Sequence, residues 1–217
     1  MTLRRLLIIV CALGSCAAGC GSSAATPSTR TYASGLTHAA AFAFDAQSRL
    51  WVATAAYKDD GTDGVYLVPA AGAAPVEVIR GLHTPLGLLW LRGELYVASK
   101  ERVDAYSGLV HNRFTKHRTV LTLPRGVGES NNLVLAPDGR LLLGISAPCD
   151  HCVPKSKYSA AIVSFTTTGR DLRVYARDIR APVGLAFLNG KLYVTIDRKS
   201  TRLNSSHRRL SRMPSSA

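Results

Sequence analysis

Short apolar runs, separated by turn-forming residues, fill the sequence between residues 42 and 195. One phrase recurs four times there: an apolar run, a tight turn and a second apolar run. The turn is Pro-Asp-Gly in the third copy and Asn-Gly in the fourth, and both are typical of β-hairpins. The four copies occupy residues 42–53, 86–98, 132–143 and 183–195.

The spacing of the copies predicts the architecture. Equivalent leucines lie 45, 46 and 51 residues apart, at Leu50, Leu95, Leu141 and Leu192. Two more strand-like runs follow each of the first three copies, at residues 65–68 and 76–80, 103–107 and 119–123, and 161–165 and 172–176. Four strands in about 45 residues are typical of a β-propeller blade.

We therefore expect an all-β protein. Residues 35–197 should form a partial β-propeller, an incomplete arc of about three and a half four-stranded blades. A β-sandwich whose hairpins are similar by coincidence is the alternative.

The first 20 residues have the parts of an export signal: Arg4 and Arg5, an apolar stretch, and then small residues. The residues around Cys20 resemble a bacterial lipobox, so Cys20 is the predicted lipidation site, with Cys16 as the alternative. Residues 21–34 are expected to form a flexible tether. The other interpretation is an ordinary signal peptide. Both interpretations predict an exported protein of the bacterial cell envelope. In the lipobox interpretation, the lipid on the cysteine is the protein's only contact with the membrane.

The strand pattern ends at residue 198. Residues 198–217 are basic, contain no acidic residue and resemble segments translated from adapter or out-of-frame DNA. We expect a disordered tail that is foreign or artefactual. A genuine basic, disordered C-terminus is the alternative.

Charge does not indicate a nucleic-acid-binding protein. The net charge of the 217 residues is +13, but eight of the 27 basic residues lie in the leader and the tail. The body therefore carries only about +5, without the basic stripe interleaved with aromatic residues that nucleic-acid grooves show. We predict no nucleic-acid partner. The longest apolar run is also too short to predict a membrane-spanning helix.

The cysteines agree with export. Three of the five lie in the leader, which leaves Cys149 and Cys152 in the body. Two cysteines three residues apart in an exported protein predict one local disulfide. The alternatives are half of a zinc site, which has only His151 nearby as a further ligand, a thioredoxin-type redox motif, which lacks its βαβ context, and haem attachment, which would need a histidine in place of Val153.

The third copy carries a family resemblance. Its phrases resemble those of the glucose/sorbosone dehydrogenase-like family, and the resemblance extends over roughly residues 35–197. The Cys-x-x-Cys phrase and the arginine-proline-glycine phrase are its more specific parts. They lie at residues 131–133, 137–141, 144–152, 159–165 and 179–187. The resemblance implies a six-bladed propeller that oxidises sugars with pyrroloquinoline quinone (PQQ), and it implies PQQ and calcium as cofactors. The small-molecule partner would be a sugar or a glycan.

The chain departs from the family at the catalytic base. The resemblance places a histidine three residues before the first Asn of the Asn-Asn phrase, where this chain has Gly128. Glycine cannot accept a proton, and the adjacent Glu129 is a weak replacement. The amides of Asn131 and Asn132 are equally able to bind the quinone or a polyol or to cap the strand.

Enzymatic activity is therefore left open. If it is active at full length, the protein would be a PQQ-dependent sugar dehydrogenase, and we expect this fragment by itself to be inactive. The alternative function is a non-catalytic surface propeller that binds a sugar, a glycan or a protein.

Other polar residues are expected to have ordinary roles. His38 and His83 occupy equivalent positions before two of the copies, and we interpret them as surface histidines rather than ligands. The acidic run Asp59, Asp60 and Asp63 lacks the spacing of a calcium loop, so we expect a solvated turn. His151 is expected to be an exposed loop residue.

Overall fold

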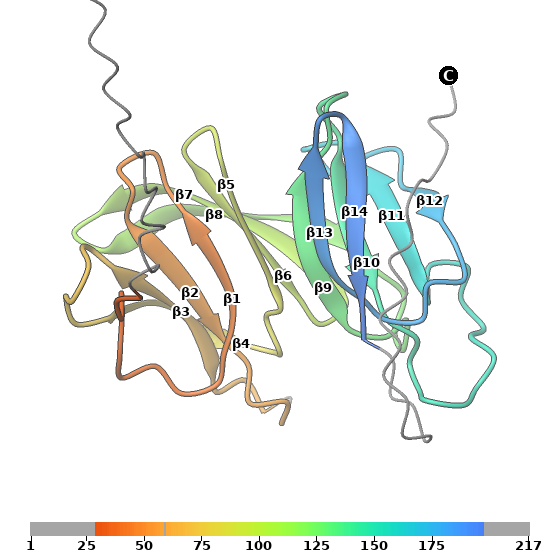
Figure 1. Cartoon of the computed structure of the whole chain (residues 1–217), viewed down its shortest axis with the longest axis horizontal. Coiled ribbons are helices and arrows are strands. Elements are labelled where there is room, and N and C mark those ends of the chain that lie inside the picture. Colours follow the sequence, from red (N-terminus) through yellow and green to blue (C-terminus); the bar gives the residue numbers. More distant parts are fainter. Residues whose placement is uncertain (1–28, 59, 198–217) are drawn as a thin grey trace, which may run out of the picture. The chain divides into compact units, whose positions relative to one another are not determined.

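The computed structural model describes residues 29–58 and 60–197 (Figure 1). The chain divides into two units, residues 1–30 and 31–217, and every described strand belongs to the second unit. Fourteen strands form three four-stranded antiparallel sheets and one two-stranded sheet. None of the described residues forms a helix long and apolar enough to cross a membrane.

Each sheet is a meander of consecutive strands. Sheet 1 contains β1(Ala39–Phe44), β2(Leu50–Thr54), β3(Asp63–Val68) and β4(Val76–Leu82). Sheet 2 contains β5(Gly87–Leu91), β6(Glu94–Ser99), β7(Arg102–Val110) and β8(Arg113–Thr122). Sheet 3 contains β9(Ser130–Leu135), β10(Leu141–Ile145), β11(Ala161–Phe165) and β12(Arg173–Ala176), and the last sheet contains β13(Pro182–Leu188) and β14(Lys191–Ile196).

This arrangement confirms the predicted three and a half propeller blades. The strands predicted from the repeat are present, and the meander order excludes the β-sandwich alternative. The hairpin turns explain the register. Arg92 and Gly93 both have positive φ angles, as do Asn189 and Gly190. This is the conformation of two-residue turns whose twist matches the twist of the strands they join.

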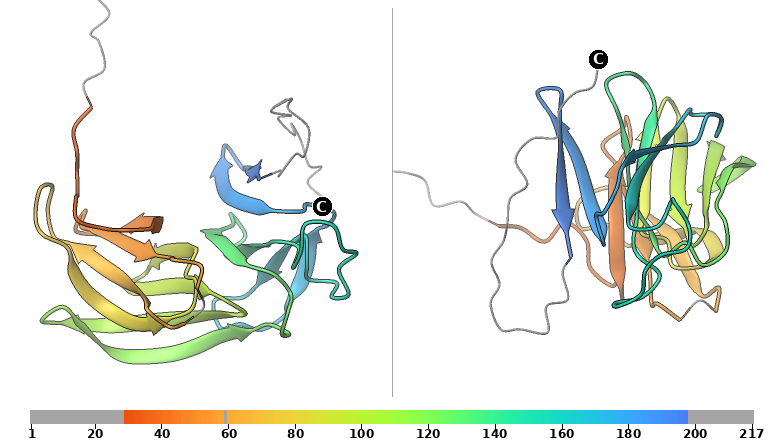
Figure 2. Two further views of the ribbon diagram at one scale, coloured as in Figure 1. Left: turned by 90° about the horizontal axis from the view of Figure 1, so that it is seen from below. Right: turned by 90° about the vertical axis from the view of Figure 1, so that its right-hand side faces the viewer.

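The core lies between consecutive sheets, which pack face to face in the views of Figure 2. Sheets 1 and 2 share an aromatic cluster in which the buried Trp51 stacks on Trp90, with ring centroids 5.6 Å apart, and Phe114 lies 5.4 Å from Trp51. Aliphatic side chains, together with the buried rings of Tyr96 and Phe165, fill the space between sheets 2 and 3, and aliphatic side chains with Phe187 fill that between sheet 3 and the β13–β14 hairpin. Each sheet thus buries its apolar face against a neighbour.

The first strands of consecutive sheets contact one another: β1 contacts β5, β5 contacts β9, and β9 contacts β13. Glycines allow two very close approaches near these strands. A Cβ atom on Gly87 of β5 would lie 2.3 Å from the carbonyl oxygen of Asn131 in β9. A Cβ atom on Gly144 of β10 would lie 2.3 Å from the carbonyl oxygen of Pro182 in β13. Any other residue at either position would push two sheets apart.

The two outermost faces are only partly covered by described residues. Tyr32, Ala33 and Leu36 pack on the outer face of sheet 1, so part of the expected tether lies against the propeller. Beyond them Phe42 is 70% exposed, and Leu188 on the last hairpin is 60% exposed.

We predict that Gly87→Ala lowers the free energy of unfolding by about 2–3 kcal/mol, because the added methyl group meets a backbone carbonyl that cannot rotate away. Gly93→Ala is the control. A Cβ atom on Gly93 would meet no other atom, so the only cost of its substitution is the left-handed backbone conformation, about 1 kcal/mol. Denaturant unfolding curves provide the comparison, and a smaller loss for Gly87→Ala than for Gly93→Ala would contradict the close approach of β5 and β9.

Candidate functional site

The loops that follow the second and fourth strands of each sheet lie at one end, which we call the loop end. Backbone hydrogen bonds join these loops in pairs. Lys100 N donates to His83 O at 2.9 Å, and Ser146 N donates to Glu129 O at 3.0 Å. Residues from separate sheets can therefore meet at the loop end, as they do in propellers generally.

Two carboxylates from other sheets, Glu129 and Asp197, act electrostatically on Tyr57 at this end, and we call the three residues the Tyr57 cluster. Tyr57 lies in the loop after β2, Glu129 lies directly before β9, and Asp197 directly follows β14. The pKa of the Tyr57 phenol is raised above 10.0, first by partial desolvation and then by the negative charges of Glu129 and Asp197. The side chain is nonetheless 65% exposed, so a ligand from solvent can reach it.

The backbone explains why glycine occupies position 128. Gly128 has a φ of 109°, and a Cβ atom there would lie 2.1 Å from the carbonyl oxygen of Ser146. A histidine could not be accommodated without moving β10, so the base position implied by the family resemblance is closed in this chain. Glu129 is the neighbouring acidic group, and its Oε2 atom is buried. The role of Glu129 as a base stays a prediction.

The two asparagines differ in their surroundings. Asn131 is only 4% exposed, and its Nδ2 atom donates a hydrogen bond to Ser146 Oγ at 2.8 Å. Asn132 is partly exposed and, as the next residue in the strand, points to the opposite face. Asn131 therefore ties β9 to the end of β10, while binding of a quinone or a polyol by either amide stays a prediction.

The predicted disulfide between Cys149 and Cys152 is present, with the two Cα atoms 5.7 Å apart. It closes part of the loop between β10 and β11, and Cys152 N donates to Cys149 Sγ at 2.8 Å. The guanidinium of Arg180 donates to the carbonyl oxygen of Cys149. The disulfide loop is thereby fixed to the connection that leads into β13. His151 in the same loop is exposed, as expected.

The remaining predicted residues are placed as follows. His38 and His83 are both exposed. Asp60 accepts hydrogen bonds from Thr62, at 3.1 Å from the backbone N and 2.6 Å from Oγ1, and this matches the expected solvated turn. Asp63, by contrast, is buried and accepts from the backbone N atoms of Ala56 and Thr84. For Asp63 the expectation of a solvated position is wrong, because its carboxylate organises two loops.

The described residues contain no group of side chains of the kind that makes up a metal site. Within residues 29–58 and 60–197, no three His, Cys, Asp or Glu side chains come together as a metal-binding group. Cys16, Cys20, Asp59 and the tail from residue 198 lie outside the described residues.

Comparison with known proteins bears on the fold. No protein-family model matches the sequence, and no curated protein matches it. Solved structures do match. The PQQ domain of pyranose dehydrogenase from Coprinopsis cinerea gives a TM-score of 0.64 at 14% identity, covering 82% of this chain and 49% of that one. The chain thus shares the β-propeller fold of these solved structures.

Two further structures agree. A protein from Thermus thermophilus assigned as an oxidoreductase (glucose dehydrogenase) gives a TM-score of 0.58 at 20% identity, covering 76% of this chain and 60% of that one. The calcium-binding protein regucalcin from Agrobacterium tumefaciens gives 0.57 at 15% identity, covering 76% and 54%. The chain spans about half the length of these structures. The resemblance stated from the sequence is thus confirmed for the fold.

Tyr57 and Asp197 were not identified from the sequence as site residues. Neither belongs to the repeated phrase, since one lies in a loop and the other directly follows the last strand. Only the strand order could have indicated that the two residues lie at the same end. Tyr57 follows β2 and Asp197 follows β14, and the loops after the second strands of all sheets lie at one end of the propeller.

We predict that the Tyr57 phenol titrates above pH 10 and that Glu129→Gln lowers its midpoint, because one of the two negative charges that oppose ionisation is removed. NMR of ¹³C-tyrosine-labelled protein, assigned with Tyr57→Phe, measures this midpoint. Glu77→Gln is the matched control, since Glu77 raises the pKa of Tyr66 instead. A Tyr57 midpoint that is the same with and without the Glu129 carboxylate would contradict the cluster.

Proposed function

We propose that this propeller recognises a sugar at the Tyr57 cluster. The proposal is supported by the electrostatic effect of Glu129 and Asp197 on the exposed Tyr57 at the loop end, in a propeller whose fold is shared with sugar dehydrogenases. Carboxylates accept hydrogen bonds from sugar hydroxyls, and charged acceptors make the stronger hydrogen bonds. The exposed ring of Tyr57 adds an apolar surface for the C–H face of the sugar.

The charges of the Tyr57 cluster show whether it could bind PQQ. PQQ is held in the family by basic residues that bind its carboxylates, whereas both charged members of the Tyr57 cluster, Glu129 and Asp197, are acidic. The negative charges of Glu129 and Asp197 would repel the PQQ carboxylates at this cluster. The Tyr57 cluster therefore does not fit PQQ, and we derive no step through it.

Oxidation of the bound sugar is the second candidate function. The likeness to the Coprinopsis cinerea PQQ domain favours it, and Glu129 is the acidic residue next to the position of the family's base. The closed backbone at Gly128 favours the other interpretation, a propeller that binds sugar without turning it over.

The sugar proposal predicts that the chain binds at least one aldose and that Glu129→Gln and Asp197→Asn each weaken the binding by about fivefold or more, through loss of a charged acceptor. Equilibrium dialysis against a panel of labelled aldoses measures this. Asp138→Asn is the control, because Asp138 lies in the exposed β9–β10 turn at the opposite end of sheet 3. Equal effects of all three substitutions, or no binding across the panel, would contradict the proposal.

The same samples separate the two candidate functions. Reduction of an artificial electron acceptor after addition of PQQ and calcium would establish sugar oxidation. Sugar binding that depends on Glu129 but gives no turnover would support the non-catalytic propeller.

We also propose that the protein is exported and anchored by a lipid on Cys20. The disulfide supports export, because disulfides persist in oxidising compartments outside the cytosol. Labelled palmitate fed to an expressing bacterium should be incorporated into the wild-type chain and into Cys16→Ala, and incorporation should be lost in Cys20→Ala. The reverse pattern would assign the lipid to Cys16, and no incorporation in any chain would contradict the anchor.

A further inference from the structure

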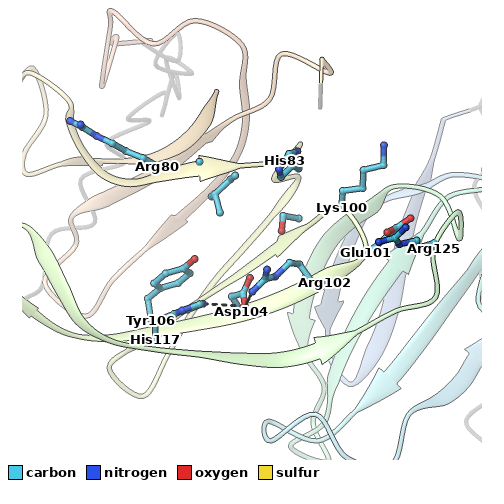
Figure 3. A pocket seen from close by; sticks show the side chains of 12 residues that line it. Arg80, His83, Lys100, Glu101, Arg102, Asp104, Tyr106, His117 and Arg125 are labelled. Atoms are coloured by element: carbon cyan, nitrogen blue, oxygen red, sulfur yellow. Dashed lines mark hydrogen bonds and ion pairs between the residues drawn. The ribbon is translucent and has the colours of Figure 1, made fainter. Parts of the chain in front are cut away.

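A groove of about 570 Å³ lies between sheets 1 and 2 (Figure 3). Its walls are the end of β4, the β6–β7 turn, the first half of β7 and parts of β8 and the loop that follows it. The volume is in the range of small-molecule sites. None of the groove residues belongs to the Tyr57 cluster, so the two sites are made of different side chains.

The groove carries an excess of positive charge. Four lysine and arginine side chains line it against two carboxylates: Arg80, Lys100, Arg102, Arg125, Glu101 and Asp104. Arg80 is paired with Glu77 outside the lining, with Arg80 Nε 2.5 Å from Glu77 Oε2, so the positive excess rests on the other cations. His83 and His117 also line it and add positive charge whenever they are protonated. A concave surface of one prevailing sign concentrates ions of the opposite sign.

Both carboxylates of the groove already accept hydrogen bonds from the protein. Asp104 is only 2% exposed; its Oδ1 atom accepts from Arg102 at 2.6 Å and from Thr119 Oγ1 at 3.0 Å, and lies 3.2 Å from His117 Nε2. Glu101 accepts from the backbone N of Gly126 at 2.5 Å. Asp104 therefore holds the guanidinium of Arg102 in place, and Glu101 holds the loop after β8 that carries Arg125.

An aromatic wall completes the groove. The ring of Tyr106 stacks on His117, with centroids 4.6 Å apart and planes inclined by 19°. Burial and the nearby charge of Asp104 raise the pKa of Tyr106 to about 12, so its hydroxyl remains a donor at physiological pH. Figure 3 shows Tyr106 and His117 on one side of the groove and Lys100 and Arg125 on the other.

We propose that this groove binds a small organic or inorganic anion through a phosphate or carboxylate group. Lys100 and Arg125 supply the charge-assisted hydrogen bonds, the Tyr106 hydroxyl supplies a neutral donor, and Arg102 is held in place by Asp104. Inorganic phosphate and gluconate are the probes for the two anionic groups, and glucose is the neutral analogue of gluconate.

The test is equilibrium dialysis of the full chain with each labelled probe. The double variant Lys100→Gln/Arg125→Gln should weaken the binding of phosphate, gluconate or both by about tenfold or more. The double variant Arg113→Gln/Lys116→Gln removes the same charges from exposed positions of β8 outside the groove, and its binding should match the wild type. Binding should also weaken as sodium chloride is added.

Tyr106→Phe keeps the stack and removes only the hydroxyl, so it tests the groove even if the double variant is unstable. We expect it to weaken anion binding by about threefold. Equal loss of binding in both double variants, binding of glucose as tight as that of gluconate, or no binding of either anion would overturn the proposal. These outcomes leave the sugar proposal untouched, because that proposal depends on Glu129 and Asp197.

Discussion

The close approach of neighbouring sheets near their first strands is the constraint on which the structure depends. Where Gly87 meets the backbone of β9 and Gly144 meets the backbone of β13, a single Cβ atom would separate the sheets. This proximity lets the apolar faces of consecutive sheets interlock, as in the stack of Trp51 on Trp90. Burial of these faces is the main favourable contribution to the fold, and it is available only while the strands stay close.

The same constraint shapes both sites. The convergence of the sheets places Glu129 and Asp197 where their charges act on Tyr57 at the loop end, although 140 residues separate Tyr57 from Asp197 in sequence. The close approach of Gly128 to Ser146 leaves no room there for a histidine. Away from the first strands the apolar contact between sheets 1 and 2 gives way to polar residues, and the space between the sheets becomes the cationic groove.

The fold was predictable because the strand–turn–strand phrase repeats, and each hairpin encodes its own turn, as at Asn189 and Gly190. The Cys149–Cys152 disulfide was predictable from its spacing. The sites were less so. The charges of Glu129 and Asp197 reach Tyr57 only through packing between sheets, and the burial of Asp63 depends on backbone donors from two separate loops. Sequence patterns report local periodicity, whereas these positions follow from contacts between sheets.

The most direct test of a sugar site at the meeting point of the sheets is the NMR response of individual tyrosines to a bound aldose. In ¹³C-tyrosine-labelled protein, the resonance of Tyr57 should shift on saturation with the sugar. Tyr175 and Tyr193, which are exposed on other strands, should not respond. A saturable sugar effect at Tyr175 or Tyr193 with Tyr57 unchanged would contradict the account.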